Sequence, residues 1–174
     1  MKLLSFDIES NGLHGQAFAV GAVVVDATGH VWDEFTARCP IIGKVDPWVV
    51  EHVLPPLQSL PETHADAKAL REAFWPWYHS AAAKADYVLA TNPYPVEARF
   101  LIACQQDDLK NRYFEHPFPL LDLGTLYVQA GARSPQARDR LVDEAAGDAP
   151  KLEHHPRWDA WVAARIALKL LARK

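Results

Sequence analysis

The chain has 174 residues, of which 49% are hydrophobic and 23% charged, a composition that excludes a disordered or fibrous protein and indicates one globular domain spanning residues 1–174. The net charge of −4 argues against a protein that binds long duplex nucleic acid through many phosphates, but it allows a short or single-stranded substrate. No apolar run approaches the roughly 18 residues of a membrane span, and MKLLSF is too short for a signal peptide. We therefore expect a cytoplasmic protein that does not contact a membrane.

The first forty residues predict three strands. Apolar runs at 2–9, 17–27 and 30–39 alternate with the turn signals SNGLHGQ and TGH. Short connections between successive strands indicate an antiparallel meander. The proline-rich segment 40–64 has no sustained period, so we expect a surface excursion there with at most a short helix.

The rest of the chain alternates between helices and strands. In chain order we expect a helix at 65–85, a buried strand at 86–92, a helix at 95–108, a strand running into a helix at 118–131 and a long helix at 156–174. Pro76 marks a kink or restart in the first of these helices. Strand–helix–strand alternation implies parallel crossovers. The predicted fold class is therefore α/β, a mixed five-stranded sheet in which the meander is extended by parallel strands and flanked by helices.

Two carboxylates, Asp7 and Glu9, interrupt the first apolar strand. Side chains alternate between the faces of a strand, so residues at i and i+2 point to the same side and bring these two acids close together. Desolvated like charges repel, and an ion such as Mg²⁺ or Mn²⁺, which prefers oxygen ligands, would compensate both. The alternative is an exposed edge strand whose polar face lies in water.

Two further acids are predicted in the first turns of helices. Glu97 follows the strand at 86–92, and Asp159 lies five residues after His154. Each alone is explained by the helix dipole, which favours an acid in the first turn. Together with Asp7 and Glu9 they could hold two metal ions at one end of the sheet, with His154 nearby as a base.

The segments FDIESNGL, PVEARFL and HHPRWDA, in this order and at these intervals, resemble the three motifs of the DEDDh 3′–5′ exonucleases. This family of the ribonuclease H-like superfamily includes ribonuclease T, oligoribonuclease and the proofreading subunit of bacterial DNA polymerase III. The resemblance covers residues 4 to about 168. It implies a hydrolase that removes nucleotides from the 3′ end of single-stranded RNA or DNA and releases nucleoside monophosphates. The compact chain favours RNA slightly.

The resemblance also implies a role for each motif residue. Two divalent ions, Mg²⁺ or Mn²⁺, are held by Asp7, Glu9, Glu97 and Asp159, and His154 takes the proton of the attacking water. His155 is the alternative base, but it lies one residue too near Asp159 for the family spacing. The residues expected to meet the terminal nucleotide are Ser10, Asn11, Gly12 and Leu13. Leu13 would pack against its base, and the alternative for Leu13 is a place in the hairpin core.

One residue departs from the family pattern, because Glu97 stands where family members usually carry Asp. The added methylene moves the carboxylate oxygens, which leaves open a second hypothesis: a nucleic-acid-binding module of the same fold with weakened catalysis. Retention of all four acids and of the histidine favours the enzyme.

Other features have more than one interpretation. Trp48, Trp158 and Trp161 could stack on bases, but core positions are favoured for them. Asp122 is expected to cap the following helix rather than bind metal. Small members of the family imply a homodimer, although the apolar stretch at 158–171 could equally be internal core.

Overall fold

The computed structural model describes residues 1–115 and 119–172. The elements in chain order are β1 (Lys2–Ser10), β2 (Ala17–Asp26), β3 (Val31–Arg38), the π-helical turn η1 (Val49–Val53), the 3₁₀ turn η2 (Pro56–Ser59), α1 (Ala67–Ala82), β4 (Tyr87–Ala90), the π-helical turn η3 (Pro93–Glu97), α2 (Ala98–Asp107), α3 (Leu109–Arg112), β5 (Leu120–Asp122), α4 (Leu123–Gln129), α5 (Pro135–Ala146) and α6 (Pro156–Leu171). Positions 118, 173 and 174 of the predicted elements lie outside the described residues.

The strands form one mixed sheet in the order β3-β2-β1-β4-β5. β1 pairs antiparallel with β2 and parallel with β4, and β5 continues the parallel part. The predicted fold class, a meander extended by parallel strands, is confirmed. In the parallel register Phe6 lies opposite Ala90, so Asp7 and Thr91, the next residue of each chain segment, meet near the carboxyl end of β4.

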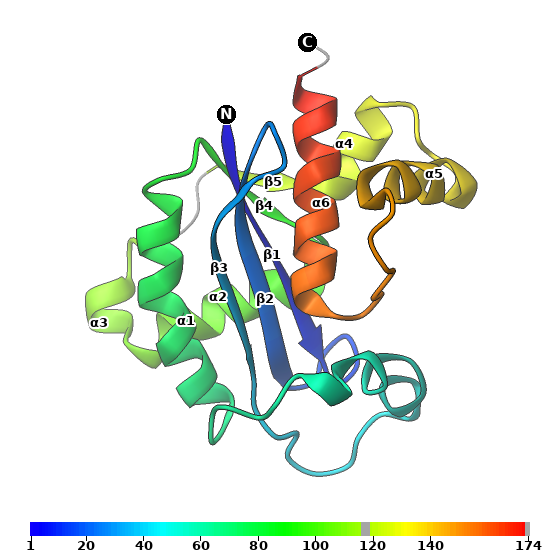
Figure 1. The fold of residues 1–174 in the computed structure, drawn as a ribbon. Coiled ribbons are helices and arrows are strands. Elements are labelled where there is room, and N and C mark those ends of the chain that lie inside the picture. The colour runs from blue at the N-terminus through cyan, green and yellow to red at the C-terminus, as the bar shows by residue number, and fades with distance from the viewer. Residues whose placement is uncertain (116–118, 173–174) are drawn as a thin grey trace.

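Helices cover both faces of the sheet, with α1 and α6 on opposite sides in Figure 1. Alternate β1 side chains supply two separate cores. Leu4, Phe6 and Ile8 pack with α1 and α2, whereas Leu3 packs with α6 on the other face. Asp7 and Glu9 share the face of Leu3, because side chains two residues apart on a strand point the same way. Both acids therefore face α6.

Close contact between the sheet and the start of α6 depends on Gly21. A Cβ atom at this position would lie 2.1 Å from the backbone nitrogen of Arg157 and 2.2 Å from the carbonyl carbon of Pro156. Gly21 pairs with Asp7 across β1 and β2. The absence of a side chain at Gly21 thus allows the first turn of α6, which carries Asp159, to approach Asp7.

The prediction that segment 40–64 is a surface excursion was wrong for three positions. Val49, Val53 and Leu57 lie in the core on the α1 side of the sheet. Two short helical turns, separated by Leu54 and Pro55, hold them there. Turns of four or five residues show too few apolar repeats for a helical period to be recognised in the sequence.

Two helices differ from the expectation. α1 continues through Pro76 as one helix, so the predicted restart is wrong, and the alternative of a kink stays a prediction. α5 was not predicted at all, although its ends carry ordinary signals. Ser134 caps its first turn by accepting a hydrogen bond from the backbone of Ala137, Pro135 occupies its first position, and Gly147 follows it with φ +58°. Its low apolar content concealed the helical period.

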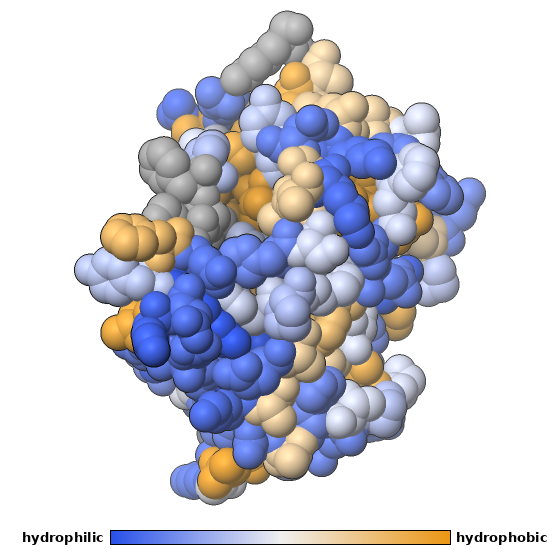
Figure 2. Space-filling model, turned by 90° about the vertical axis from the view of Figure 1, so that its left-hand side faces the viewer, coloured by the Kyte–Doolittle hydropathy of each residue, from blue (hydrophilic) through white to orange (hydrophobic). Residues whose placement is uncertain are grey.

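The apolar stretch of α6 is internal core, since Trp158, Val162 and Ile166 are all buried. The face of the molecule that carries α1 and α3 is largely hydrophilic, with separate hydrophobic spots (Figure 2). Over residues 1–115 and 119–172, no helix has the length and apolar character that crossing a membrane requires.

Candidate active site

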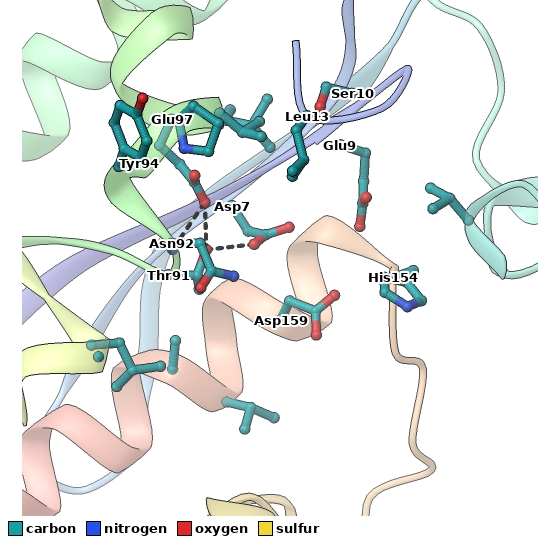
Figure 3. A pocket seen from close by; sticks show the side chains of 18 of the residues that line it. Asp7, Glu9, Ser10, Leu13, Thr91, Asn92, Tyr94, Glu97, His154 and Asp159 are labelled. Atoms are coloured by element: carbon teal, nitrogen blue, oxygen red, sulfur yellow. Dashed lines mark hydrogen bonds between the residues drawn. The ribbon is translucent and has the colours of Figure 1, made fainter. Parts of the chain in front are cut away.

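Three carboxylates from β1 and α6 converge at the edge of the sheet. Asp7, Glu9 and Asp159 each place an oxygen within 4.8 Å of the others. Figure 3 shows the two β1 side chains and Asp159 of α6 directed into the same space. Asp7 and Glu9 are each only 8% exposed, so the alternative of a water-facing polar edge strand is wrong.

Loss of solvent around these carboxyls raises their pKa values. Burial is the main cause in each case, and it raises the pKa of Asp7 to about 6, that of Glu9 to about 10 and that of Asp159 to about 9. The negative charge of Asp7 raises the pKa of the other two further. Within the described part of the chain, no Lys or Arg forms an ion pair with any of the three. The cluster must therefore hold protons or a cation.

Glu97 lies beside this cluster but outside the group of three. It is 1% exposed, and the hydroxyl of Thr91 lies between it and Asp7 (Figure 3). The hydroxyl oxygen is 2.8 Å from Glu97 Oε1 and also hydrogen-bonds Asp7 Oδ1. A hydroxyl has one proton and can donate to one carboxylate at a time, so the second contact needs a proton on a carboxyl. Burial, followed by the charge of Asp7, raises the pKa of Glu97 to about 8.

The donor set fits a divalent metal ion. Clustered carboxylate oxygens are the ligands that Mg²⁺ and Mn²⁺ prefer, and a dication removes the repulsion that raises the pKa values. Glu97 Oε2 is buried and has no hydrogen-bond partner among the described residues. Asp7, Glu9 and Asp159 would hold an ion directly, and Glu97 supplies a further unsatisfied oxygen next to them.

His154 lies at the rim of the same space, just before α6 (Figure 3). Its φ of +63° is in the left-handed region, which non-glycine residues rarely adopt. The ring of Trp48 meets its imidazole edge-on, with the ring centroids 5.2 Å apart. Burial lowers the pKa of His154, so its imidazole is neutral and can accept a proton near neutral pH. His155 instead precedes α6 as its N-cap residue and does not line the cleft.

The loop between β1 and β2 forms one wall of the cleft. Ser10, Gly12 and Leu13 line it, whereas Asn11 does not. The side chain of Asn11 instead ties the loop to segment 44–46, donating to a backbone oxygen at 3.0 Å and accepting from a backbone nitrogen at 2.7 Å. Leu13 is 66% exposed, so the alternative of a hairpin-core position is wrong. Gly12 turns the chain here with φ +72°.

No protein-family model and no curated relative matches the chain. Solved structures do resemble it. Exonuclease X in complex with 5′ overhanging duplex DNA superimposes with a TM-score of 0.61 at 15% identity, covering 99% of this chain and 92% of that one. S. pombe Pop2p in its Mg²⁺- and Mn²⁺-bound form gives 0.69 at 11% identity, with 98% and 83% covered. The nuclease domain of 3′hExo, a DEDDh family member bound to rAMP, gives 0.63 at 13% identity, with 99% and 91% covered. The chain shares the overall fold of these three structures.

Within this shared fold, the acids and His154 open into a cleft of about 850 Å³. Three cleft residues were missed or misplaced by the sequence interpretation. Trp48 was favoured as core but is 52% exposed, and Tyr94, 84% exposed, was not identified. Thr91 was also missed. It directly follows the apolar strand β4, and ligand-binding sites of parallel sheets lie at the carboxyl ends of their strands.

Two other predictions about nearby residues are confirmed. Trp158 is buried, as its helical spacing indicated. Asp122 caps α4, because its carboxylate accepts hydrogen bonds from the backbone nitrogens of Gly124 and Thr125, and it does not line the cleft.

Proposed function

We propose that this protein is a metal-dependent 3′–5′ exonuclease that hydrolyses phosphodiester bonds at the 3′ end of single-stranded nucleic acid, with RNA slightly favoured over DNA. The observation that carries the proposal is the buried cluster of Asp7, Glu9 and Asp159 at the floor of an open cleft, with His154 at its rim. Carboxylates that hold divalent ions recur in enzymes that displace phosphate oxygens. Similarity in fold to Exonuclease X and the 3′hExo nuclease domain supports the same class of reaction.

The residues divide the work of this reaction. Asp7, Glu9, Asp159 and Glu97 would hold two divalent ions, Mg²⁺ or Mn²⁺, which would supply Lewis acidity to the phosphate and to the attacking water. His154, neutral because burial lowers its pKa, accepts the proton of that water. The water oxygen bonds to phosphorus, the bond to the 3′ oxygen of the retained strand breaks, that oxygen takes up a proton from solvent, and a nucleoside 5′-monophosphate leaves.

The walls of the cleft suit unpaired nucleotides. Leu13, Trp48 and Tyr94 line it and are each more than half exposed, so they present apolar surface to a ligand. Bases in a single strand can splay out and stack on such side chains, whereas bases within a duplex cannot. The net charge of −4 also disfavours many phosphate contacts along a long duplex.

A second candidate is a nucleic-acid-binding module with weakened catalysis, which is favoured by the position of Glu97 outside the group of three carboxylates. Incubation of 3′- and 5′-labelled single strands with Mn²⁺ or Mg²⁺ separates the two. The exonuclease degrades the strands, Asp7→Ala abolishes degradation, and Asp122→Asn, a matched change in an acid outside the cleft, leaves it intact. Intact strands that are nevertheless bound by the wild type would establish the binding module.

A further inference from the structure

The cleft continues beyond the acids into a space that the proposed chemistry does not use. We call the part of the cleft that residues of α4, α5 and α6 line its second arm. Its principal lining residues are Leu123 and Tyr127 of α4, Arg138 and Val142 of α5, and Val162 and Ile166 of α6. Four of the six are aliphatic, so this part of the cleft is mainly apolar, with one cation.

Arg138 differs from the other residues around it. Among the described residues that line the cleft, it is the one Lys or Arg, and no carboxylate in the described chain pairs with it. Arg71 and Arg157, by contrast, have carboxylate partners at 2.6 and 2.7 Å. The guanidinium of Arg138 lies over the ring of Tyr127, 5.9 Å from the ring centre. A cation–π contact of this kind steadies the side chain without satisfying its hydrogen-bond donors.

The second arm begins at the acids. Asp159, Val162 and Ile166 all line the cleft and, at spacings of three and four, lie along one face of α6. Seven residues of helix rise about 10 Å. At about 3.4 Å per phosphate along one strand, 10 Å spans about three phosphates, so the arm holds only the nucleotides next to the reacting bond.

We infer that the arm between α4, α5 and α6 binds the retained strand, and that Arg138 contacts one of the first two phosphates on the 5′ side of the scissile bond. This inference rests on the proposed function, in which the terminal nucleotide meets Leu13 and the loop before β2. The retained strand must leave the acids in another direction, and the second arm offers one. Arg138 is exposed in this arm, where its guanidinium can pair with a phosphate through charge-assisted hydrogen bonds.

Single neutral linkages test the contact directly. Hexanucleotides with one methylphosphonate, placed at the first, second or fourth linkage upstream of the scissile bond, lack one charge each. We expect Arg138→Ala to raise KM for release of the first nucleotide from the unmodified strand about tenfold, the size of one charge-assisted hydrogen bond. In the wild type, a neutral linkage at the contacted position should raise KM by about the same factor as Arg138→Ala does with the unmodified strand. In Arg138→Ala the neutral linkage should raise KM no further, because both changes remove the same contact.

Arg133→Ala is the matched control, since Arg133 is exposed, lies five residues earlier and does not line the cleft. We expect it to respond to each neutral linkage as the wild type does, and the fourth linkage to have no effect in any variant. The inference is overturned if the effects of Arg138→Ala and of every neutral linkage on KM multiply independently, or if Arg133→Ala raises KM as much as Arg138→Ala does.

Failure of the proposed function gives a different result. A wild type that releases no nucleotide from the unmodified strand contradicts the exonuclease, and binding still tests Arg138. In an Asp7→Asn background, Arg138→Ala should weaken anisotropy-measured binding of the same hexanucleotide and reduce the slope of log K against log salt by about 0.7, the value for one phosphate of a single strand. An unchanged slope refutes the phosphate contact, whatever the activity.

Discussion

Replacing Asp7 by Asn should stabilise the metal-free protein and abolish its stabilisation by Mn²⁺. Asp7 lies within 4.8 Å of carboxylate oxygens of both Glu9 and Asp159, and its charge raises their pKa values. Asn removes that charge with little change in shape. Its side-chain oxygen can still accept the hydrogen bond that Thr91 gives to Asp7. The change therefore relieves repulsion while it removes one metal ligand.

The size of the effect follows from the distance. Two unit charges 4.8 Å apart interact by about 3 kcal/mol at an effective dielectric constant of about 20. Because the raised pKa values leave the cluster partly protonated at neutral pH, we expect about 1–2 kcal/mol of relief rather than the full value. For a chain of 174 residues this corresponds to a rise in Tm of about 2–8 °C.

Thermal unfolding in EDTA and in Mn²⁺ measures both effects. At a Mn²⁺ concentration one hundred times its Kd, binding stabilises the wild type by about 2.7 kcal/mol. Asp7→Asn should unfold at a higher temperature than the wild type in EDTA and gain little from Mn²⁺. Asp122→Asn, which changes an acid outside the cleft, should keep the wild-type response to Mn²⁺. A variant at Asp7 that is less stable in EDTA, or that keeps the full response to Mn²⁺, refutes the reasoning.

Three further predictions follow from the same site. His154→Gln should lower kcat about 10²–10⁴-fold while the Mn²⁺-induced rise in Tm remains. Loss of that rise in the variant would instead mark His154 as a metal ligand. In the wild type the rate should increase with pH around a midpoint below 6.5, because burial lowers the pKa of His154. Glu97→Asp should retain measurable activity and Glu97→Ala almost none, and equal, full activity in both would remove Glu97 from the metal site. In EDTA the free energy of unfolding should fall as pH rises from about 4.5. Burial raises the folded-state pKa of Glu9 to about 10 and that of Asp159 to about 9, so the folded protein holds protons that the unfolded chain has released. Urea titrations that show stability rising between pH 6 and 9 would contradict the direction of these pKa shifts.

Local periodicity was sufficient to predict most of the sheet. The alternation of side chains along β1 placed Asp7 and Glu9 on one face without any knowledge of α6, because the period of a strand is fixed by its backbone. The proline at the first position of α6 likewise marked the start of the helix whose first turn carries Asp159. These features depend on neighbouring residues alone, which is why the sequence contains them.

Contacts between distant segments were harder to predict. The edge-on contact of Trp48 with His154 joins residues more than a hundred positions apart, and no local pattern indicates it. The hydroxyl of Thr91 reaches Asp7 only because β1 and β4 are parallel neighbours in a particular register. The role of Gly21 is similar, because the need for a bare backbone arises from the helix packed against it.

Glu97 shows most clearly which feature of the site the sequence pattern does not specify. Its position after a strand indicated an acid at the correct edge of the sheet, and the structure places it there. Its longer side chain turns toward Thr91 and the backbone of Asn92, however, and it lies outside the group formed by Asp7, Glu9 and Asp159. The direction in which the longer glutamate side chain turns depends on side-chain packing, which the sequence pattern does not specify.

The most direct test of the proposed activity is the identity and order of the products from a 5′-labelled single strand. With Mn²⁺, the wild type should shorten the strand from its 3′ end one nucleotide at a time and release nucleoside 5′-monophosphates, which mass spectrometry identifies. Asp7→Asn should release none under the same conditions. Release of the 5′ label as a mononucleotide at the first time point, products that carry a 3′-phosphate, or equal degradation by Asp7→Asn would contradict a 3′–5′ exonuclease centred on these carboxylates.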